Sequence, residues 1–174
     1  MGSWVRVATW FSLAAWLTAG MGCAGYKLGP TGGQEAGARS VQINPVQNAT
    51  LMPGLGPSLA QALRKQVQRD GTFLLDTRGT GDVVVNCEVV DYRRRGIAYQ
   101  PNDTLTAADY ELTATVRVVA TERGSGREIL NKEVRGRTTI RIGTDQTSAE
   151  RQAVPILAEN LAYNITALLV DGEW

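Results

Sequence analysis

The chain contains no histidine, so it lacks the residue that most often serves as a general base and as a metal ligand. A Gly-rich phosphate loop, paired cysteines at metal-ligand spacing and a Gly-x-Ser-x-Gly nucleophile elbow are also absent from its 174 residues. An enzyme would need a carboxylate pair such as Asp103 and Asp109 to converge, and no neighbouring residue is suited to orient that pair. We therefore predict a non-catalytic protein with no cofactor and no metal site.

Cysteine is scarce and net charge is low. The two cysteines are Cys23, near the N-terminus, and Cys87, which lies among apolar residues and is typical of a buried core position. If Cys23 is modified, no disulfide can form within the chain. The formal net charge of +1 gives no overall attraction to nucleic acid, so we predict no nucleic-acid partner. An anionic ligand would have to be bound by a local basic cluster.

The N-terminal segment has the composition of a cleaved export signal. Arg6 is its only charged side chain, and residues 7–19 are mostly apolar. A helix of that length rises about 20 Å, which is short for a hydrocarbon core of ~30 Å. We therefore predict a lipoprotein-type signal peptide over residues 1–22.

Cys23 is the predicted site of lipid attachment. Gly22 fits lipoprotein processing, whereas the two residues before it fit less well. Acylation of Cys23, with palmitate among the acyl chains, would hold the mature chain at a membrane by its first residue. The alternative is ordinary signal cleavage, which would leave a soluble periplasmic protein with a free thiol. Residues 23–39, rich in glycine, would form the lipidated N-terminus and a flexible tether, and residues 40–174 a single domain.

Hydrophobic periodicity predicts strands and helices in alternating blocks. Period-two patterns indicate strands over residues 40–46, 83–89, 112–118 and 130–142, and helical spacing indicates helices over residues 57–70 and 147–171. Residues 73–75 form a brief apolar run with the length of a short edge strand, and residues 124–126 a hairpin turn. The segments 48–56 and 96–108 are expected to be loops. The helix that begins at Pro57 should end near Asp70-Gly71.

The C-terminal helix carries two conflicting signals. Thr147 and Glu150 have the spacing of a capping box, which predicts a helix start there. Pro155 lies about two turns further on, where it would either kink the helix or mark the start of its main part. With both helices amphipathic and each long strand polar on one face, we expect an α+β fold. The predicted architecture is a two-layer sandwich of about four strands in a mixed sheet, with two helices on one face and no deep pocket.

Two basic clusters stand out in this nearly neutral chain. They are Arg93, Arg94 and Arg95, after the first long strand, and Arg135, Arg137 and Arg141, along the last one. Alternate strand residues lie ~6–7 Å apart on one face, close enough for neighbouring arginines to bind one multiply charged ligand. We predict these six residues as contacts for an anionic ligand or a partner. The alternative is a solvated sheet face whose arginines pair with Glu88, Glu111 and Glu133.

Several segments together resemble the lipopolysaccharide-assembly lipoprotein family, LptE. The first is the cysteine followed by a Gly-Tyr-x-Leu motif, here Cys23-Ala24-Gly25-Tyr26-Lys27-Leu28 with Ala24 as one extra residue. A strand then leads to an Asn-x-Thr turn, Asn48-Ala49-Thr50, and an apolar helix over residues 57–67. The remaining order of three strands and a helix is similar too, so the resemblance covers residues 23 to about 169.

The resemblance implies a lipid-anchored protein on the periplasmic side of the outer membrane. Members of the family plug an outer-membrane β-barrel, the LptD-like lipopolysaccharide-assembly protein, and bind lipopolysaccharide through basic residues. The two arginine clusters are candidates for that contact by their chemistry. The alternative function is that of an outer-membrane lipoprotein of similar fold which regulates another protein, for example as the activator of a peptidoglycan synthase.

Overall fold

The computed structural model describes residues 36–100, 103–141 and 145–171. The predicted signal peptide, the lipid site at Cys23 and nearly all of the predicted tether lie outside these residues. The described residues form the elements β1 (Arg39–Ile43), β2 (Gln47–Asn48), α2 (Leu55–Asp70), β3 (Phe73–Asp76), β4 (Val83–Gln100), β5 (Asp103–Glu122), β6 (Glu128–Arg141) and α3 (Gln146–Asp171).

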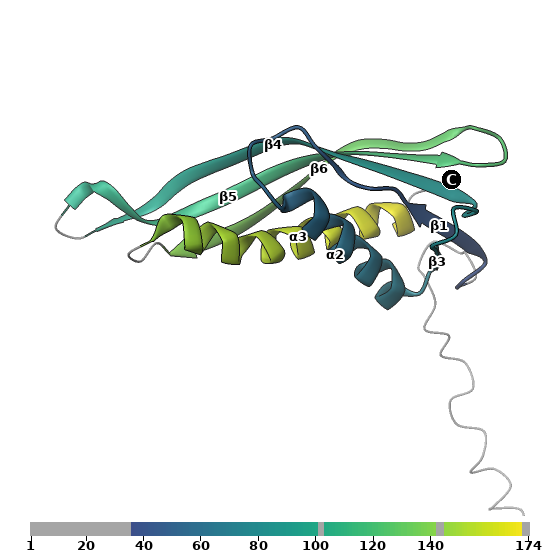
Figure 1. Cartoon of the computed structure of the whole chain (residues 1–174), viewed down its shortest axis with the longest axis horizontal. Helices are drawn as coiled ribbons and strands as arrows, with labels where there is room; N and C mark the ends of the chain where they lie inside the picture. The colour runs from purple at the N-terminus through teal and green to yellow at the C-terminus, as the bar shows by residue number, and fades with distance from the viewer. Residues whose placement is uncertain (1–35, 101–102, 142–144, 172–174) are drawn as a thin grey trace, which may run out of the picture.

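The strands form one mixed sheet in the order β3-β1-β4-β5-β6, and β2 pairs with β4. β1 runs parallel to β3 and β4, β2 runs parallel to β4, and the β4–β5 and β5–β6 pairs are antiparallel. Both helices lie on the same side of this sheet, as Figure 1 shows. The predicted α+β class and the two helices on one face are confirmed. The expected four strands are wrong, because the sheet has 6. The short edge strand expected over residues 73–75 is confirmed as β3, whereas β2, with 2 residues, is too short to give an alternating pattern.

β4 and β5 form a much longer hairpin than the pattern predicted, with 18 and 20 residues. The loop expected over residues 96–108 is wrong, because Gly96 pairs with Tyr110 and Tyr99 with Ala107. Register shifts after Val89 and again beyond Gly96 interrupt the alternation of polar and apolar residues, which hides these strands in the sequence. The end of the hairpin extends well past β1, β2 and β3 (Figure 1).

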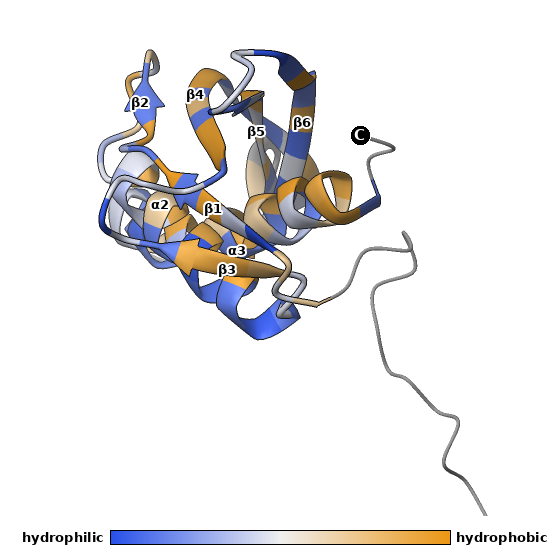
Figure 2. Ribbon diagram, turned by 90° about the vertical axis from the view of Figure 1, so that its right-hand side faces the viewer, coloured by the Kyte–Doolittle hydropathy of each residue, from blue (hydrophilic) through white to orange (hydrophobic). Residues whose placement is uncertain are grey.

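The core lies between the sheet and the two helices. Val85 and Cys87 of β4 and Val116 and Val118 of β5 belong to one buried cluster with Leu161 of α3. Orange and blue positions alternate along the strands in Figure 2, as expected for a sheet with one buried face. The Cys87 side chain is only 3% exposed, which confirms its predicted core position. Burial raises the pKa of its thiol to about 12.

The first helix, α2, begins slightly earlier than expected and ends where expected. It begins at Leu55, two residues before Pro57. At its end Gly71 adopts a left-handed φ of 76°, and its N–H donates to the carbonyl of Val67. This arrangement is a common way to terminate a helix, because glycine adopts positive φ without steric cost.

The long C-terminal helix, α3, begins with a different cap from the one predicted. The carboxylate of Asp145 accepts a hydrogen bond of 2.9 Å from the backbone N–H of Thr147, and the hydroxyl of Ser148 also donates to it. These bonds hold the pKa of Asp145 below its ordinary value. The predicted capping box at Thr147 is therefore wrong, since the aspartate two residues earlier occupies the capping position. The helix continues through Pro155, which lies on its exposed side.

By length and composition α3 is apolar enough to cross a membrane. Its main apolar stripe is instead turned toward the protein, where Leu157, Leu161, Ile165 and Leu169 are each at most 2% exposed, although Ile156 and Tyr163 are exposed. The hydrophobicity of α3 is therefore largely explained by its packing against the sheet on one side and against α2 on another.

Candidate functional site

The face of the sheet opposite the helices is polar and carries most of the predicted arginines. Strand register places Arg93 of β4 opposite Thr113 of β5, and Thr113 opposite Arg137 of β6. On the same face, Thr115 of β5 lies opposite Arg135 of β6, and Asp109 of β5 lies opposite Arg141 of β6. Neighbouring strands are ~4.8 Å apart, so Arg93 and Arg137 start about 10 Å from each other across the sheet.

Three of the arginines on this face are paired with carboxylates beside them. Arg141 contacts both oxygens of Asp109, at 2.8 and 3.2 Å. This pairing lowers the pKa of Asp109. Arg95 lies 3.0 Å from Glu111, and Arg93 lies 2.8 Å from Asp91. All three arginine side chains are at least 75% exposed, whereas their partners Glu111 and Asp109 are only 23% and 19% exposed.

Arg117, on the same face, is paired with two of the glutamates that the sequence analysis named as alternative partners. Its guanidinium lies 3.3 Å from Glu88 of β4 and 3.7 Å from Glu133 of β6, so it bridges the two strands beside its own. Together with the Arg95–Glu111 pair, this is the solvated, charge-balanced face that the sequence left open as an alternative. Part of the arginine pattern is therefore explained by pairing within the sheet.

Arg94 is separated from Arg93 and Arg95 because alternate residues of a strand point to opposite faces. Its side chain contacts Glu150 of α3. Its guanidinium carbon also lies 5.5 Å from the centre of the Tyr110 ring. Arg94 thus joins β4 to the first turns of α3 on the helix side of the sheet, and the structure does not bring it together with the other predicted contacts.

Arg135 and Arg137 differ from the other four candidates. Among the described residues, neither guanidinium has an ion pair or a hydrogen bond. Both residues are exposed and lie on β6, the last strand of the sheet. Two exposed guanidinium groups on one edge strand, without carboxylates of their own, make this the best anion-binding position on the polar face.

The backbone of these two arginines is held by α3. The side-chain amide of Asn164 donates a bond of 2.9 Å to the Arg135 carbonyl, and the Arg137 N–H donates a bond of 3.1 Å to the Asn160 side-chain oxygen. A groove of about 490 Å³ lies at this edge, lined by Glu111, Thr113, Arg135, Gly136, Arg137, Asn160 and Asn164. Sequence reasoning missed both asparagines, although their four-residue spacing on a helix indicates that they share one face.

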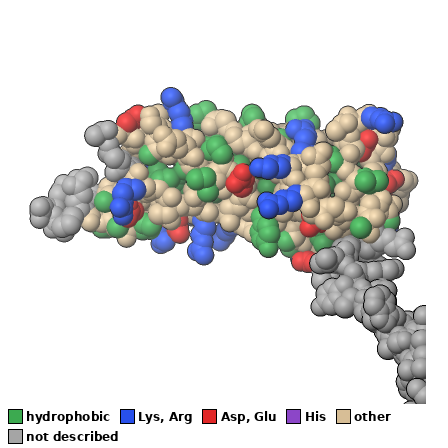
Figure 3. Space-filling model, turned by 90° about the horizontal axis from the view of Figure 1, so that it is seen from below, with side chains coloured by type: hydrophobic (Ala, Val, Ile, Leu, Met, Phe, Trp, Pro, Cys, Tyr) green, Lys and Arg blue, Asp and Glu red, His purple; other side chains and the backbone are tan. Residues whose placement is uncertain are grey.

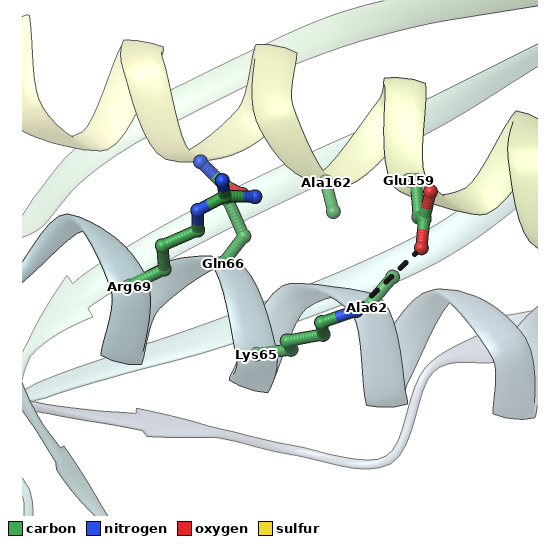
Figure 4. A pocket seen from close by; sticks show the side chains of 6 residues that line it. All are labelled: Ala62, Lys65, Gln66, Arg69, Glu159 and Ala162. Carbon is green, nitrogen blue, oxygen red and sulfur yellow. Dashed lines mark ion pairs between the residues drawn. The ribbon is translucent and has the colours of Figure 1, made fainter.

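A second hollow lies between the two helices (Figure 4). Ala62 of α2 and Ala162 of α3 line it, and their small side chains allow the helices to approach closely. Lys65 and Glu159 form an exposed ion pair of 3.8 Å across it. The hollow has a volume of about 240 Å³ and includes none of the predicted site residues. It is explained by the crossing of two helices with small contact residues.

Charges on the side of the molecule shown in Figure 3 are dispersed. Lys and Arg side chains lie along its length, and several are next to Asp or Glu. In the part of the chain that the structure describes, no group of three or more Cys, Asp or Glu side chains is arranged to hold a metal ion. The edge of β6 therefore stands out by its unpaired arginines and by the groove beside them.

Comparison with known proteins points to one family. The family model LptE, described as lipopolysaccharide-assembly, matches residues 38–169. A search of curated proteins gave no match. A chain that matches a family model over this extent shares its fold from β1 to the last turn of α3.

Three solved structures are similar in fold. Protein XCC0632 from Xanthomonas campestris has a TM-score of 0.56 and 10% identity, covering 83% of this chain and 91% of that one. The hypothetical protein CT253 from Chlamydia trachomatis has a TM-score of 0.54 and 14% identity, covering 76% and 96%. A minor lipoprotein from Acinetobacter baumannii has a TM-score of 0.50 and 16% identity, covering 76% and 92%. At these identities the likeness concerns the fold alone, and the family model, which spans nearly all of the described sheet and both helices, shows that the chain belongs to the LptE lipopolysaccharide-assembly family.

Proposed function

We propose that this protein binds the phosphates of lipopolysaccharide at the β6 edge and assists, without catalysis, in lipopolysaccharide assembly at the outer membrane. The observation that carries the proposal is that Arg135 and Arg137 have no carboxylate partner among the described residues, whereas Arg93, Arg95 and Arg141 do. Unpaired arginines can bind an anion without first losing an ion pair.

The chemistry of the edge fits a phosphorylated glycolipid. Arginine binds phosphate through two parallel hydrogen bonds, and Arg135 and Arg137 start ~6–7 Å apart on one strand. An ion pair exposed at both ends is weak, so Arg93, whose partner Asp91 is also exposed, could exchange its carboxylate for a ligand phosphate at little cost. Such arginines would also compete with the divalent ions that bridge neighbouring glycolipid phosphates.

The proposal includes a place in the cell. The acylated Cys23 would hold the protein at the periplasmic side of the outer membrane, and the tether up to residue 39 would keep the domain close to that surface. There the domain would plug or dock beneath an LptD-like β-barrel and help to pass lipopolysaccharide to it. Membership of the LptE family and the polar, arginine-bearing sheet face support this role.

Binding of lipopolysaccharide by the purified full-length chain in nonionic detergent tests the site. Replacing both arginines, Arg135→Glu and Arg137→Glu, should weaken binding by at least about tenfold, since each charge-assisted hydrogen bond contributes roughly 1.5–3 kcal/mol. Arg64→Glu together with Arg69→Glu on α2 is the matched control, because both residues are exposed and lie outside the groove. Equal losses in both proteins, or undiminished binding to dephosphorylated lipopolysaccharide, would reject the site.

Co-purification and depletion test the cellular role. The tagged full-length chain should bring down a large β-barrel protein from detergent extracts, and its depletion should reduce lipopolysaccharide at the cell surface. Failure to recover a barrel would count against the plug. A cell-wall defect with normal surface lipopolysaccharide would support the alternative of an activator of peptidoglycan synthesis.

A further inference from the structure

The outer half of β4 has an open backbone edge. β1 pairs with β4 only over residues 83–85, and β2 only over residues 88–89. Beyond that point, over residues 91–99, the described strands pair with β4 on one side alone, through β5. Nine strand residues present an edge about 30 Å long. Figure 1 shows this part of β4 along the border of the extended hairpin.

The free backbone groups on this edge can be identified. The Val89 carbonyl accepts a bond from the Ala49 N–H, so Val89 directs its backbone groups away from β5. Val89 pairs with Val116 of β5. The next residues on the same face of β4 are Tyr92 and Arg94, which pair with Ala114 and Leu112 of β5. In an antiparallel pair, hydrogen-bonded and non-hydrogen-bonded residue pairs alternate along the strands. Tyr92, Arg94 and Gly96 therefore resemble Val89 and also direct their N–H and C=O groups away from β5.

The outward backbone groups of β6, at the other edge of the sheet, have side-chain partners. On β6, side chains of Asn160 and Asn164 bond to the outward backbone groups of Arg137 and Arg135. No described side chain bonds to the outward groups of Tyr92, Arg94 or Gly96. An unprotected strand edge is a template for pairing with another chain, and this one has been left open while the opposite edge is covered.

Charge indicates which chain would pair there. The side chains of Arg93 and Arg95 are 80% and 75% exposed and share one face, whereas Arg94 lies on the other face. Arg93 and Arg95 each contact one carboxylate, Asp91 and Glu111, but a guanidinium can hold two, as Arg117 does with Glu88 and Glu133. A second copy of β4 in antiparallel pairing would place arginines opposite arginines, which is unfavourable. Acidic residues on an added strand would instead lie beside Arg93 and Arg95. Ile97, which is 45% exposed, offers an apolar contact further along the same edge.

We propose that the edge of β4 over residues 91–99 binds an extended acidic segment of another protein as an added β-strand. The backbone groups of Tyr92, Arg94 and Gly96 would supply the affinity, and Arg93 and Arg95 the selectivity for acidic residues. The inference does not depend on the proposed lipopolysaccharide site, because the two arginines that carry that proposal, Arg135 and Arg137, lie at the opposite edge of the sheet, although Arg93 could contact either ligand.

A synthetic peptide of about nine residues, in which glutamate alternates with valine, covers this edge at ~3.3 Å per residue and serves as the probe. The full-length chain in nonionic detergent should bind it, and amide hydrogen exchange should slow at Tyr92, Arg94 and Gly96. A peptide with lysine in place of glutamate should bind at least about fourfold more weakly, because two favourable cross-strand charge pairs are replaced by two unfavourable ones.

Two variants of one residue separate backbone pairing from charge. Arg94→Ala and Arg94→Pro both lose the contact with Glu150, but only the proline also removes the outward N–H. Peptide affinity should therefore be lower for Arg94→Pro than for Arg94→Ala, by up to about tenfold for one hydrogen bond. Thermal unfolding of both variants checks that they are folded.

Four results would overturn the inference. They are no binding of the glutamate peptide, equal binding of the lysine peptide, equal affinity of folded Arg94→Ala and Arg94→Pro, and slowed exchange at this edge on raising the protein concentration without peptide. The last result would assign the edge to a second copy of the chain.

Discussion

A Cβ atom on Gly136 would lie 2.5 Å from Cγ and 2.8 Å from Cδ2 of Leu161. Real Cβ atoms do not approach so closely, so the absence of a side chain on β6 is what allows α3 to cross the strand at this point. Leu161 is fully buried there. The close crossing also brings Asn160 and Asn164, on either side of Leu161 in the same helix, to the edge of β6.

Replacing Gly136 by alanine should therefore destabilise the fold. Inserting a methyl group into a packed contact costs about 1–3 kcal/mol, and Leu161 has little room to move because it is fully buried. Gly124→Ala is the matched control, since a Cβ there would have nothing within 4 Å. Denaturant unfolding of the two variants measures the difference. Equal stabilities would contradict the close crossing.

Asn160→Ala should expose the edge of β6 at Arg137. The Arg137 N–H would lose its side-chain acceptor, with a loss of about 0.5–1.5 kcal/mol in the free energy of unfolding. Hydrogen exchange at the Arg137 amide should become faster, while exchange within the β4–β5 pair stays the same. Asn131→Ala is the control, because Asn131 is exposed like Asn160 and lies on β6, the strand that contains Arg137. If the Arg137 amide exchanges at the wild-type rate in Asn160→Ala, the asparagine does not protect this edge.

Asp109 should show a lowered pKa that depends on Arg141. The hydrogen bonds from the Arg141 guanidinium lower the pKa of Asp109 from its ordinary value of 3.8. Because the pKa is lower in the folded state, the pair stabilises the protein above pH 3.8, and this contribution is lost as the pH falls through the lowered pKa. Titration of the Asp109 carboxyl by NMR should show its pKa rising toward 3.8 in Arg141→Ala.

The Asp109–Arg141 pair should also affect how the stability of the protein depends on pH. In Asp109→Asn, the free energy of unfolding should fall less steeply with decreasing pH below 3.8 than in the wild-type protein. High salt should reduce the difference, because the Arg141 side chain is 81% exposed and its charge is screened by ions. An unchanged pH dependence in this variant would mean that the pair does not form in solution.

Lipid attachment at Cys23 remains a prediction, because that residue lies outside the described part of the chain. Metabolic labelling with a radioactive fatty acid should label the wild-type protein and not Cys23→Ser. Cys87→Ala is the control, since the buried Cys87 thiol should not be acylated in the folded protein. Equal labelling of wild type and Cys23→Ser would remove the anchor from the proposed function.

Much of the fold follows from local patterns in the sequence. Alternation along residues 83–89 and 112–118 identified the buried face of the central strands, and Gly71 marked the end of α2. These features are local, because side-chain direction in a strand and helix termination depend on a few consecutive residues. The length of the β4–β5 hairpin is not local. It is stabilised by pairing across two strands, in a segment whose own residues favour a loop.

The candidate site shows the same division. The arginine clusters at residues 93–95 and along residues 135–141, and the resemblance to the LptE family, can be seen in the amino-acid sequence. The position of Arg94 on the opposite face, the pairing of Arg141 with Asp109, and the lack of a partner for Arg135 and Arg137 among the described residues depend on the folded structure. Which charges meet depends on strand register and on where α3 crosses β6, and both are decided by packing between segments that are distant in sequence.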